Sequence, residues 1–484
     1  MTSTATISPT TSPTSVATAS SPTSAPTTAR ASLPPAENRR RTIGLGLLIS
    51  AQFVVMLDTS IVNVALPSIQ ADMSLSATGL SWIVNAYVLT FGGLLLLFGR
   101  VADLLGRRRM FIAGSAAFTL GTLMAATAVN EWMLVAGRVI QGAGAAALSP
   151  AAMSLLMLNF PGEQRARAMS LWGASSAVGG ATGVFAGGLL TGTFGWSSVF
   201  LVTVPASVSA VVLARRVLDD TARGARRRFD AAGAITITGT VVALVHGGLG
   251  AADHSLTASS VLVALGAAAV LLVAFIAIER HATDPLVPLG LFRSPVLTTG
   301  VALAVLGGAA RASTFVLIAL YLQKALALSP EHAGLAMVPT SVMGFVVNLT
   351  VLPRVLRAIG PRRSMVAGLG ILAVGHLWMA YGPTGLGYPV AVLPGLLLVA
   401  TGVALSFTPT TMVIASAAPE TLTGLASGLA GSATQVGAAL GTATFTAIAL
   451  SAGHNLTAGF TAAFTAAAAV ALATAALALT IVRR

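Results

Sequence analysis

Long apolar segments separated by short polar ones fill the chain from about residue 43 to its end. Most of them approach or exceed the roughly 20 residues that an α-helix needs to span a bilayer. A helix satisfies its own backbone hydrogen bonds in lipid, and the alternating short segments of a membrane β-barrel are absent. The pattern predicts about fourteen membrane-spanning helices. We place them at residues 43–68, 79–99, 108–128, 132–158, 166–190, 197–214, 231–250, 258–278, 295–322, 332–352, 364–381, 388–413, 424–450 and 459–482.

The amino-acid composition indicates that these apolar segments belong to a membrane protein. The 484 residues are 55% hydrophobic and only 8% charged, with a mean hydropathy of +0.87. Soluble domains carry roughly 25% charged residues, so this chain lacks the polar surface needed to face water on all sides. We therefore predict an all-α integral membrane protein that has the lipid bilayer as its surroundings. The absence of cysteine excludes disulfides and thiol chemistry.

Basic residues are distributed unequally between the two ends of the predicted helices. Apart from Arg138 and Arg311, which fall inside spans, one membrane face receives the arginines and the opposite face receives Lys324 alone. Cytoplasmic loops carry the Lys/Arg excess, so we expect both termini in the cytoplasm. The formal charge of +13 then reflects topology, and no nucleic-acid partner is expected. The Arg-, Ala- and Gly-rich composition is typical of a GC-rich bacterial genome, which indicates a bacterial inner membrane.

An internal repeat divides the chain. The segment GRVADLLGRRR at Gly99–Arg109 recurs as PRVLRAIGPRR at Pro353–Arg363, an offset of 254 residues (99 to 353). Internal repeats of this kind are typical of secondary transporters, in which the binding site lies at the interface between the repeats. The sequence between the two repeats contains no motif from which we can infer a role. We predict four regions: a disordered, Thr/Ser/Pro/Ala-rich cytoplasmic tail at 1–40, a six-helix half at 41–216, a two-helix insert at 217–294 and a second six-helix half at 295–484.

Asp58 is the acidic residue placed deepest in a predicted span. It belongs to LDTSIVNVALP (Leu57–Pro67) and lies about fifteen residues from the cytoplasmic start, near mid-membrane at a rise of about 1.5 Å per residue. An ionised carboxylate is expensive there, so Asp58 is a candidate for carrying a proton reversibly. A permanent salt bridge or a hydrogen bond between helices is the alternative. Asn63, in the same segment, is a candidate for the substrate cavity.

Two arginines fall inside predicted spans. Arg138 remains charged and needs a partner, so it either tunes a nearby acid or ties the first helix to the fourth. Arg311, midway along the ninth span, faces Asp58 across the repeat axis, contacts an anionic part of a substrate or reaches cavity water. We expect it to line the cavity, because a lipid-facing position is energetically unfavourable. Asn348 and Gln435 are further cavity candidates, although each is equally consistent with a link between helices.

Two further motifs indicate conformational and packing roles. In the loop between the second and third helices, an acid among arginines can lock the inner surface through charge pairs and a facing helix N-terminus. Positive-inside anchoring is the alternative for its arginines. Glycines spaced by four residues along the fifth helix form one smooth face for close packing. The loop residues are Gly99, Asp103, Gly106, Arg107 and Arg108, and the packing residues are Gly179, Gly183 and Gly187.

Together these segments, over residues 43–482, resemble the major facilitator superfamily, and within it the fourteen-helix drug:proton antiporters. LDTSIVNVALP is similar to the signature of the first helix, Gly99–Arg109 to the loop signature GxLADxxGR[KR], and Leu134–Ala146 to the fourth-helix signature RxxQG. Leu104 replaces the usual basic residue of the loop, and Val184 replaces the proline of the fifth-helix signature GxxxGP. The resemblance implies proton coupling at Asp58 and Arg138 and a conformational latch at Asp103.

The sequence therefore predicts a proton-coupled antiporter that exports drugs or antibiotic-like molecules by alternating access. We expect a monomer that takes a hydrophobic or amphiphilic small molecule and uses protons as coupling ion, without a cofactor or metal. No GxxxxGK[ST] motif is present for direct ATP coupling, and no enzyme activity is expected. The scarcity of intramembrane acids favours a neutral, weakly basic or zwitterionic substrate, and Arg311 leaves an anionic one open. The alternatives are a metabolite importer or uniporter of the same fold and a non-transporting membrane sensor or scaffold.

Overall fold

The computed structural model describes residues 1, 2, 4, 35–160, 163–219, 230–253, 258–328, 330–383, 386–452 and 455–482. In this part of the chain the regular elements are helices, and it contains no strand. The predicted tail at 1–40 falls mostly outside the described residues. Its last residues, from Pro35 onward, belong to the first helix, which therefore begins earlier than predicted.

The helices before the middle of the chain correspond to the first eight predicted spans. The fifth helix is bent, and the sixth predicted span is built from two helices in succession, α6 and α7. Their bounds are α1 Pro35–Met73, α2 Ala77–Leu105, α3 Arg107–Ala126, α4 Glu131–Asn159, α5 Glu163–Phe194, α6 Ser198–Leu201, α7 Val204–Val217 and α8 Ala231–Asp253.

The later helices include several short irregular turns. Two are π-helical, one at the end of the ninth predicted span and one inside the tenth. The bounds are α9 Ser259–His281, η1 Leu289–Arg293, α10 Pro295–Leu320, η2 Tyr321–Ala325, α11 Pro330–Val346, η3 Val347–Val351, α12 Leu352–Tyr381, α13 Tyr388–Ala391, α14 Leu393–Ala417, η4 Glu420–Leu422, α15 Thr423–Ser451 and α16 Leu456–Val482.

Among the described residues, twelve helical stretches are long and apolar enough to cross a membrane, or thirteen with the bent α5. One stretch, His332–Tyr381, is 50 residues long, more than twice the roughly 20 residues of one crossing. It breaks at Gly360, which has a φ of 75° and precedes Pro361. Counted as two crossings, this stretch brings the total to the fourteen predicted. The tenth span was predicted to end at residue 352 and instead continues to Gly360.

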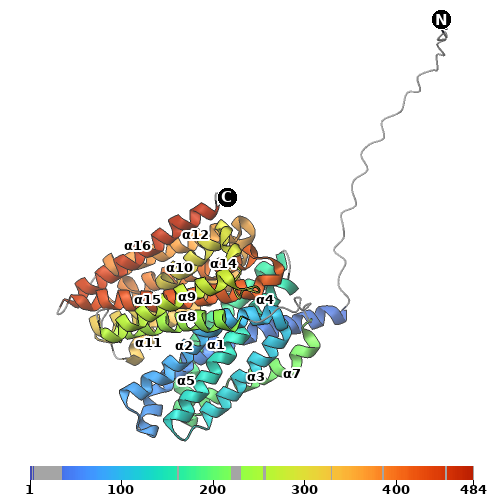
Figure 1. Cartoon of the computed structure of the whole chain (residues 1–484). Helices are drawn as coiled ribbons and strands as arrows, with labels where there is room; N and C mark the ends of the chain where they lie inside the picture. Colours follow the sequence, from blue (N-terminus) through green and yellow to red (C-terminus); the bar gives the residue numbers. More distant parts are fainter. Residues whose placement is uncertain are drawn as a thin grey trace.

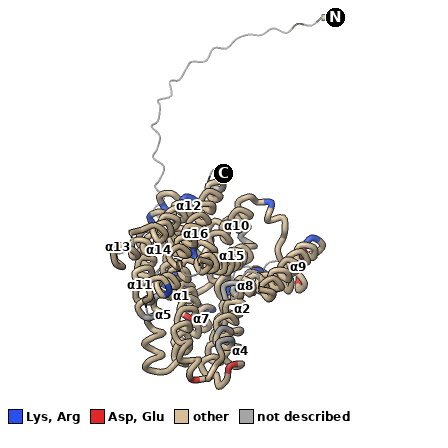
Figure 2. Tube along the Cα trace, turned by 90° about the vertical axis from the view of Figure 1, so that its left-hand side faces the viewer, with Lys and Arg blue, Asp and Glu red and all other residues tan. Residues whose placement is uncertain are grey.

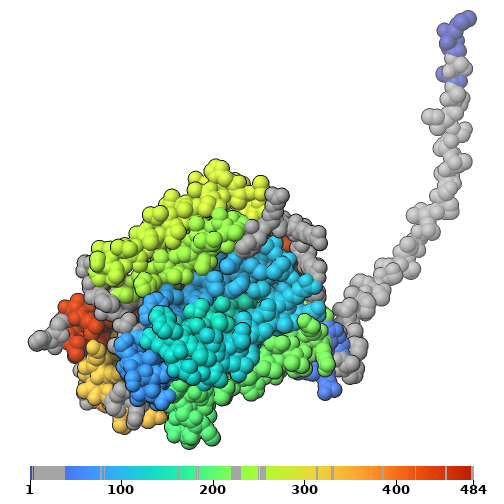
Figure 3. All heavy atoms as spheres, turned by 60° about the horizontal axis from the view of Figure 1, so that its bottom comes forward, coloured from blue at the N-terminus to red at the C-terminus, as the bar shows by residue number. Residues whose placement is uncertain are grey.

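Helices near each other in the sequence also group in space (Figure 1). In the first group α3 packs on α4, α1 on α5 and α2 on α4; in the second, α12 packs on α14 and α16, and α10 on α15. The pair α8–α9 lies at the edge of the bundle, where α8 contacts α2 and α15 (Figure 2). Its green and yellow-green atoms form one continuous band on the surface (Figure 3). We interpret these contacts as two six-helix halves and a two-helix insert.

Glycines allow the close approach of α3 and α4 that positions the central polar residues. A Cβ atom on Gly121 would lie 2.5 Å from the backbone nitrogen of Gln141, and one on Gly137 would lie 2.9 Å from that of Ala125. Any larger side chain at these positions would force the helices apart. The short separation holds one face of α4 against α3 and so fixes where Gln141, on that face, points.

Candidate functional site

A buried ion pair joins α1 to α4. Arg138 Nη1 donates a hydrogen bond of 2.7 Å to Asp58 Oδ2, and the residues are 2% and 0% exposed. Asp58 lies near the middle of α1. Burying two charges is unfavourable unless their remaining hydrogen-bonding groups are satisfied, and the surrounding residues do this.

Gln141 completes the network around the ion pair. Its Nε2 donates to the second Asp58 oxygen at 3.0 Å and to Thr122 Oγ1 at 2.8 Å, while its Oε1 accepts from Arg138 Nη1 at 2.8 Å. Arg138 Nε also donates to the carbonyl of Ile83 at 3.1 Å. Its guanidinium lies 4.2 Å from the centre of the Tyr87 ring, close enough for a cation–π contact.

The sequence analysis did not assign roles to Gln141, Thr122 or Tyr87. For Gln141 a signal was present, since it follows Arg138 by three residues and such pairs share a helix face. Thr122 and Tyr87 lie on other helices, and nothing in the sequence alone places them here. Protonation of Asp58 would remove its charge and so weaken its hydrogen bonds to Arg138 and Gln141, which join α1 to α4.

Arg311 of α10 has a different environment. It is 3% exposed, yet none of its three guanidinium nitrogens has a hydrogen-bond partner among the described residues. The ring of Phe407, on α14, lies with its centre 5.7 Å from the guanidinium carbon. Gly307, one turn earlier on α10, contacts the guanidinium directly, because it has no side chain to keep the guanidinium away.

The other predicted cavity residues are spread over several helix contacts. Asn348, in the π-helical turn η3, is buried; its Nδ2 donates to the carbonyl of Gly344 at 2.8 Å, and its Oδ1 has no partner in the described part of the chain. This oxygen lies against Gly173 of α5. Gln435 of α15 is half-buried, and its Cβ lies 3.5 Å from where a Cβ on Gly92 would be.

Asn63 lies on the exposed surface of α1, and its side chain donates to the carbonyl of Thr59 at 2.9 Å. Among the described residues, no hydrogen bond joins these predicted cavity side chains to one another or to the ion pair. The residues in question are Asn63, Arg311, Asn348 and Gln435.

A second buried polar contact lies one turn from Arg311. The hydroxyl of Thr314 donates to the carbonyl of Ala310 and lies 2.7 Å from Nε2 of His376, on α12. Which of the two groups donates in this contact depends on the tautomer of His376. Nδ1 has no hydrogen-bond partner among the described side chains and backbone.

The last turn of α2, which was predicted to be part of a loop, contacts the N-terminus of α15. Asp103 pairs with Arg107 at 2.9 Å and accepts hydrogen bonds from the backbone N–H groups of Gly424 and Leu425 at 2.9 and 2.7 Å. A carboxylate is favoured at a helix N-terminus, where N–H groups are free and the helix dipole is positive. Asp103 therefore joins the second helix of the first half to α15.

The remaining predicted loop residues shape this contact. Gly99 of α2 lies directly against Gly424, so no side chain separates the two helices. Gly106 turns the chain between α2 and α3 with a φ of 100°, a conformation that favours glycine. Arg108 donates to the carbonyl of Leu218, which follows α7, at 3.1 Å.

The glycine face of α5 packs on α1. Cβ atoms on Gly179, Gly183 and Gly187 would lie 2.7 Å from the carbonyl oxygen of Phe53, 2.7 Å from Cβ of Ser60 and 3.0 Å from the carbonyl oxygen of Ile61, respectively. These three contacts follow α1 on both sides of Asp58. They place the helix that carries Asp58 at close range to α5.

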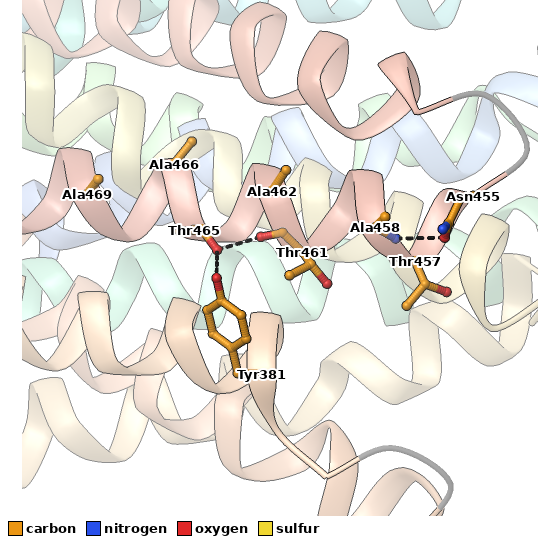
Figure 4. A pocket seen from close by; sticks show the side chains of 9 residues that line it. All are labelled: Tyr381, Asn455, Thr457, Ala458, Thr461, Ala462, Thr465, Ala466 and Ala469. Atoms are coloured by element: carbon orange, nitrogen blue, oxygen red, sulfur yellow. Dashed lines mark hydrogen bonds between the residues drawn. The ribbon is translucent and has the colours of Figure 1, made fainter.

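A surface depression lies along the first half of α16 and is separate from these residues (Figure 4). It is lined by Tyr381 and by small and polar residues of α16, and the hydroxyls of Tyr381 and Thr465 are 3.1 Å apart. None of the predicted site residues lines it. In the described part of the chain no group of three His, Asp or Glu side chains is arranged to hold a metal ion.

The fold and the buried charges define a multi-span membrane protein built from two helix groups. A model of the Major Facilitator Superfamily matches residues 48–442, and the chain belongs to that superfamily of membrane transporters. It is 37% identical over 402 residues to the cephamycin export protein CmcT of Amycolatopsis lactamdurans, covering 82% of this chain and 83% of that protein. It is 35% identical over 405 residues to the puromycin resistance protein pur8 of Streptomyces alboniger, covering 83% and 80%.

A solved structure supports the fold independently of sequence. The human organic anion transporter MFSD10 (TETRAN) superposes with a TM-score of 0.63, covering 92% of this chain and 100% of that one. At 16% identity this likeness shows the shared fold alone.

Proposed function

We propose that this protein exports drugs or antibiotic-like amphiphilic molecules across the bacterial inner membrane in exchange for protons. Its curated relatives are named for antibiotic export and resistance, which supports the substrate class and the outward direction. The observation that carries proton exchange is the buried Asp58, whose carboxylate is held by Arg138 and Gln141. We further propose that it acts as a monomer without a cofactor.

In this mechanism the Asp58 carboxylate alternately pairs with Arg138 and binds a proton. While deprotonated it pairs with Arg138 across α1 and α4, as in the structure. A proton arriving at the carboxyl removes its charge and weakens both hydrogen bonds, which frees α1 to move against α4. Release of that proton restores the pair. A membrane potential of about 100 mV supplies roughly 2.3 kcal/mol for each charge that crosses, and the pH gradient adds to it.

The contact of Asp103 with α15 stabilises the state in which the arginine-rich end of the bundle is closed. It is built from one pair with Arg107 and two backbone hydrogen bonds. Since cytoplasmic loops carry the basic excess, we assign this end to the cytoplasm, and with it both termini. The structure then corresponds to a state closed toward the cytoplasm. Opening toward the cytoplasm requires that Asp103 leave the N-terminus of α15.

The test uses inverted membrane vesicles from an efflux-deficient bacterium that expresses the protein. After the lumen is acidified, puromycin or a cephamycin is added and dissipation of the pH gradient is followed. We expect substrate-dependent proton release from wild type and none from Asp58→Asn at matched protein levels. Asp72→Asn is the control: it makes the same change at an exposed position on the same helix, and we expect wild-type behaviour.

Equal activity of wild type and Asp58→Asn would remove Asp58 from the proton path. Substrate movement that is independent of the pH gradient, and equally fast in wild type and Asp58→Asn, would favour the uniporter alternative. Uptake in the opposite direction would favour an importer. Binding without movement of substrate or protons would favour a sensor.

A further inference from the structure

Arg311 is a buried cation without a counter-ion. All three nitrogens lack a hydrogen-bond partner among the described residues, although the residue is 3% exposed and lies inside a membrane-spanning helix. An isolated charge in such surroundings is strongly unfavourable and is normally paired or hydrogen-bonded. A guanidinium cannot escape this by losing its proton, since it stays charged under all physiological conditions.

Among the described residues, no acidic side chain pairs with Arg311. Between residues 295 and 484 the acidic residues are Glu331 and Glu420. Glu331 is the second residue of α11 and Glu420 begins η4 before α15, so both lie at helix ends. Asp58 is already engaged by Arg138 and Gln141. The missing negative charge must therefore come from a molecule that binds.

The position of Arg311 matches that of the proposed proton carrier in the other half. Subtracting the repeat offset of 254 from 311 gives residue 57, the neighbour of Asp58. The first helix of one half thus carries a buried acid, and the first helix of the other half carries a buried base at the equivalent depth. In transporters built from repeats, this depth is where substrates bind.

The surroundings of Arg311 suit an amphiphilic anion. The guanidinium presents several N–H donors in a plane that matches the two oxygens of a carboxylate. The Phe407 ring beside it offers an apolar face to the body of the same molecule. Gly307 leaves no side chain over the guanidinium on its own helix.

We propose that Arg311 binds the anionic group of the transported molecule, and that the substrates of this protein therefore include amphiphilic monocarboxylates. This inference rests on the proposed export function and specifies its substrate class. It favours the anionic substrate that Arg311 left open over the neutral, weakly basic or zwitterionic one expected from the scarcity of intramembrane acids. An exported monoanion and an entering proton both move down an inside-negative potential, so such an exchange is driven by both components of the proton gradient.

The test measures equilibrium binding to the purified full-length chain in lipid nanodiscs. The probes are three monocarboxylates (cefoxitin, benzylpenicillin and fusidic acid) and the methyl ester of each, which removes the charge and keeps the rest of the molecule. For wild type we expect at least one acid to bind roughly thirtyfold more tightly than its ester, the ratio typical of losing a buried charge pair. In Arg311→Gln that ratio should fall to near one because acid binding weakens, while ester binding is unchanged.

Two further variants make the result specific. Arg311→Lys retains the charge without the planar donors and should keep part of the preference for the acid. Arg354→Gln removes an exposed arginine of the same half and should behave as wild type. If Arg311→Gln fails to fold, the acid-to-ester ratios of wild type and Arg311→Lys decide.

The inference is overturned if no acid binds wild type more tightly than its ester, or if Arg311→Gln keeps the wild-type ratio. Equal weakening of acid and ester by Arg311→Gln would also overturn it, since the residue would then only position helices. Failure of the export function is separable. A clear acid preference without proton-coupled transport in vesicles would contradict the proposed function and leave this binding site standing.

Discussion

Arg138 in the first half of this transporter and Arg311 in the second are both buried inside a membrane-spanning helix, and their surroundings are opposite in kind. Arg138 of α4 has an aspartate, a glutamine, a backbone carbonyl and an aromatic ring around it. Arg311 of α10 has one aromatic ring and no hydrogen-bond partner among the described residues. The first arrangement is complete within the protein and can change only by breaking its own bonds. The second is complete only when something binds.

This contrast separates two functions that a transporter must combine. The completed network around Arg138 is suited to a coupling ion, because a proton is small enough to enter it and disrupt it. The incomplete site around Arg311 is suited to a substrate, because it can recognise a group that the protein lacks. If the contrast is real, equivalent substitutions in the two halves must have different effects.

The largest difference is expected for removal of the paired arginine. Arg138→Met leaves Asp58 as a buried carboxylate without a cation, and breaking one side of a buried pair destabilises by about 3–5 kcal/mol. The measurement is the free energy of unfolding in detergent, followed by intrinsic fluorescence. The double variant Arg138→Met/Asp58→Leu should recover most of the loss, because it removes both charges. A loss below about 1 kcal/mol in the single variant would show that the pair does not hold α1 on α4.

A smaller effect is expected where the two halves meet. Asp103→Asn removes a charged acceptor of two backbone hydrogen bonds and of Arg107, interactions of about 1.5–3 kcal/mol each when charged. The closed state should lose population in favour of the state open at this end. The chain has no native cysteine, so a single Ser427→Cys near the start of α15 reports the opening by its rate of maleimide labelling.

Labelling of Ser427→Cys should become at least tenfold faster with Asp103→Asn, which corresponds to about 1.4 kcal/mol in the equilibrium. Asp219→Asn is the matched control, since it removes an exposed acid paired with Arg40, and exposed pairs contribute little. Unchanged labelling in the Asp103 variant would mean that this contact does not set the closed state.

Smaller losses of unfolding free energy are expected when the buried amide side chains of the two halves, Gln141 and Asn348, are replaced. Gln141→Leu deprives Asp58 and Thr122 of a donor, and we expect a loss of about 1–3 kcal/mol of unfolding free energy. Asn348→Leu removes one hydrogen bond within its own helix together with an unpaired oxygen, and should lose less than about 1 kcal/mol. Equal losses in chemical unfolding would contradict the view that only the first half has a complete network.

The smallest effect is expected to have the opposite sign. Arg311→Met replaces an unpaired buried cation by an apolar side chain of similar length, and should stabilise the protein by about 1 kcal/mol. The stabilisation should appear as a higher midpoint of thermal unfolding in the absence of substrate. A clear destabilisation would show that Arg311 has partners in the protein and would remove the contrast with Arg138.

Much of the fold could be predicted from the sequence because a helix that crosses the bilayer needs about 20 consecutive, mostly apolar residues. Each predicted span coincides with helix in the structure, since apolar length alone decides which segments cross. Ends were predicted less well. The first helix extends back to Pro35 and the tenth span continues to Gly360, because polar residues remain helical once they are outside the membrane.

The site could be predicted as a set of residues but not as an arrangement. Asp58, Arg138 and Arg311 could be identified because a charged side chain is energetically unfavourable in a membrane. This argument does not require knowing which residues surround them. That Asp58 meets Arg138, and that Arg311 meets neither, depends on how helices far apart in sequence rotate against each other. Tyr87 and Thr122 were missed for this reason, as neither is unusual in its own segment.

The central claim is that Asp58 exchanges a proton for substrate. The most direct measurement is the number of protons released when ligand is added to purified protein in weakly buffered detergent solution, repeated over a series of pH values. We expect wild type to release protons on binding puromycin or cefoxitin, and Asp58→Asn to bind the same ligand without releasing any. Equal proton release from both proteins would show that Asp58 is not the group that exchanges the proton.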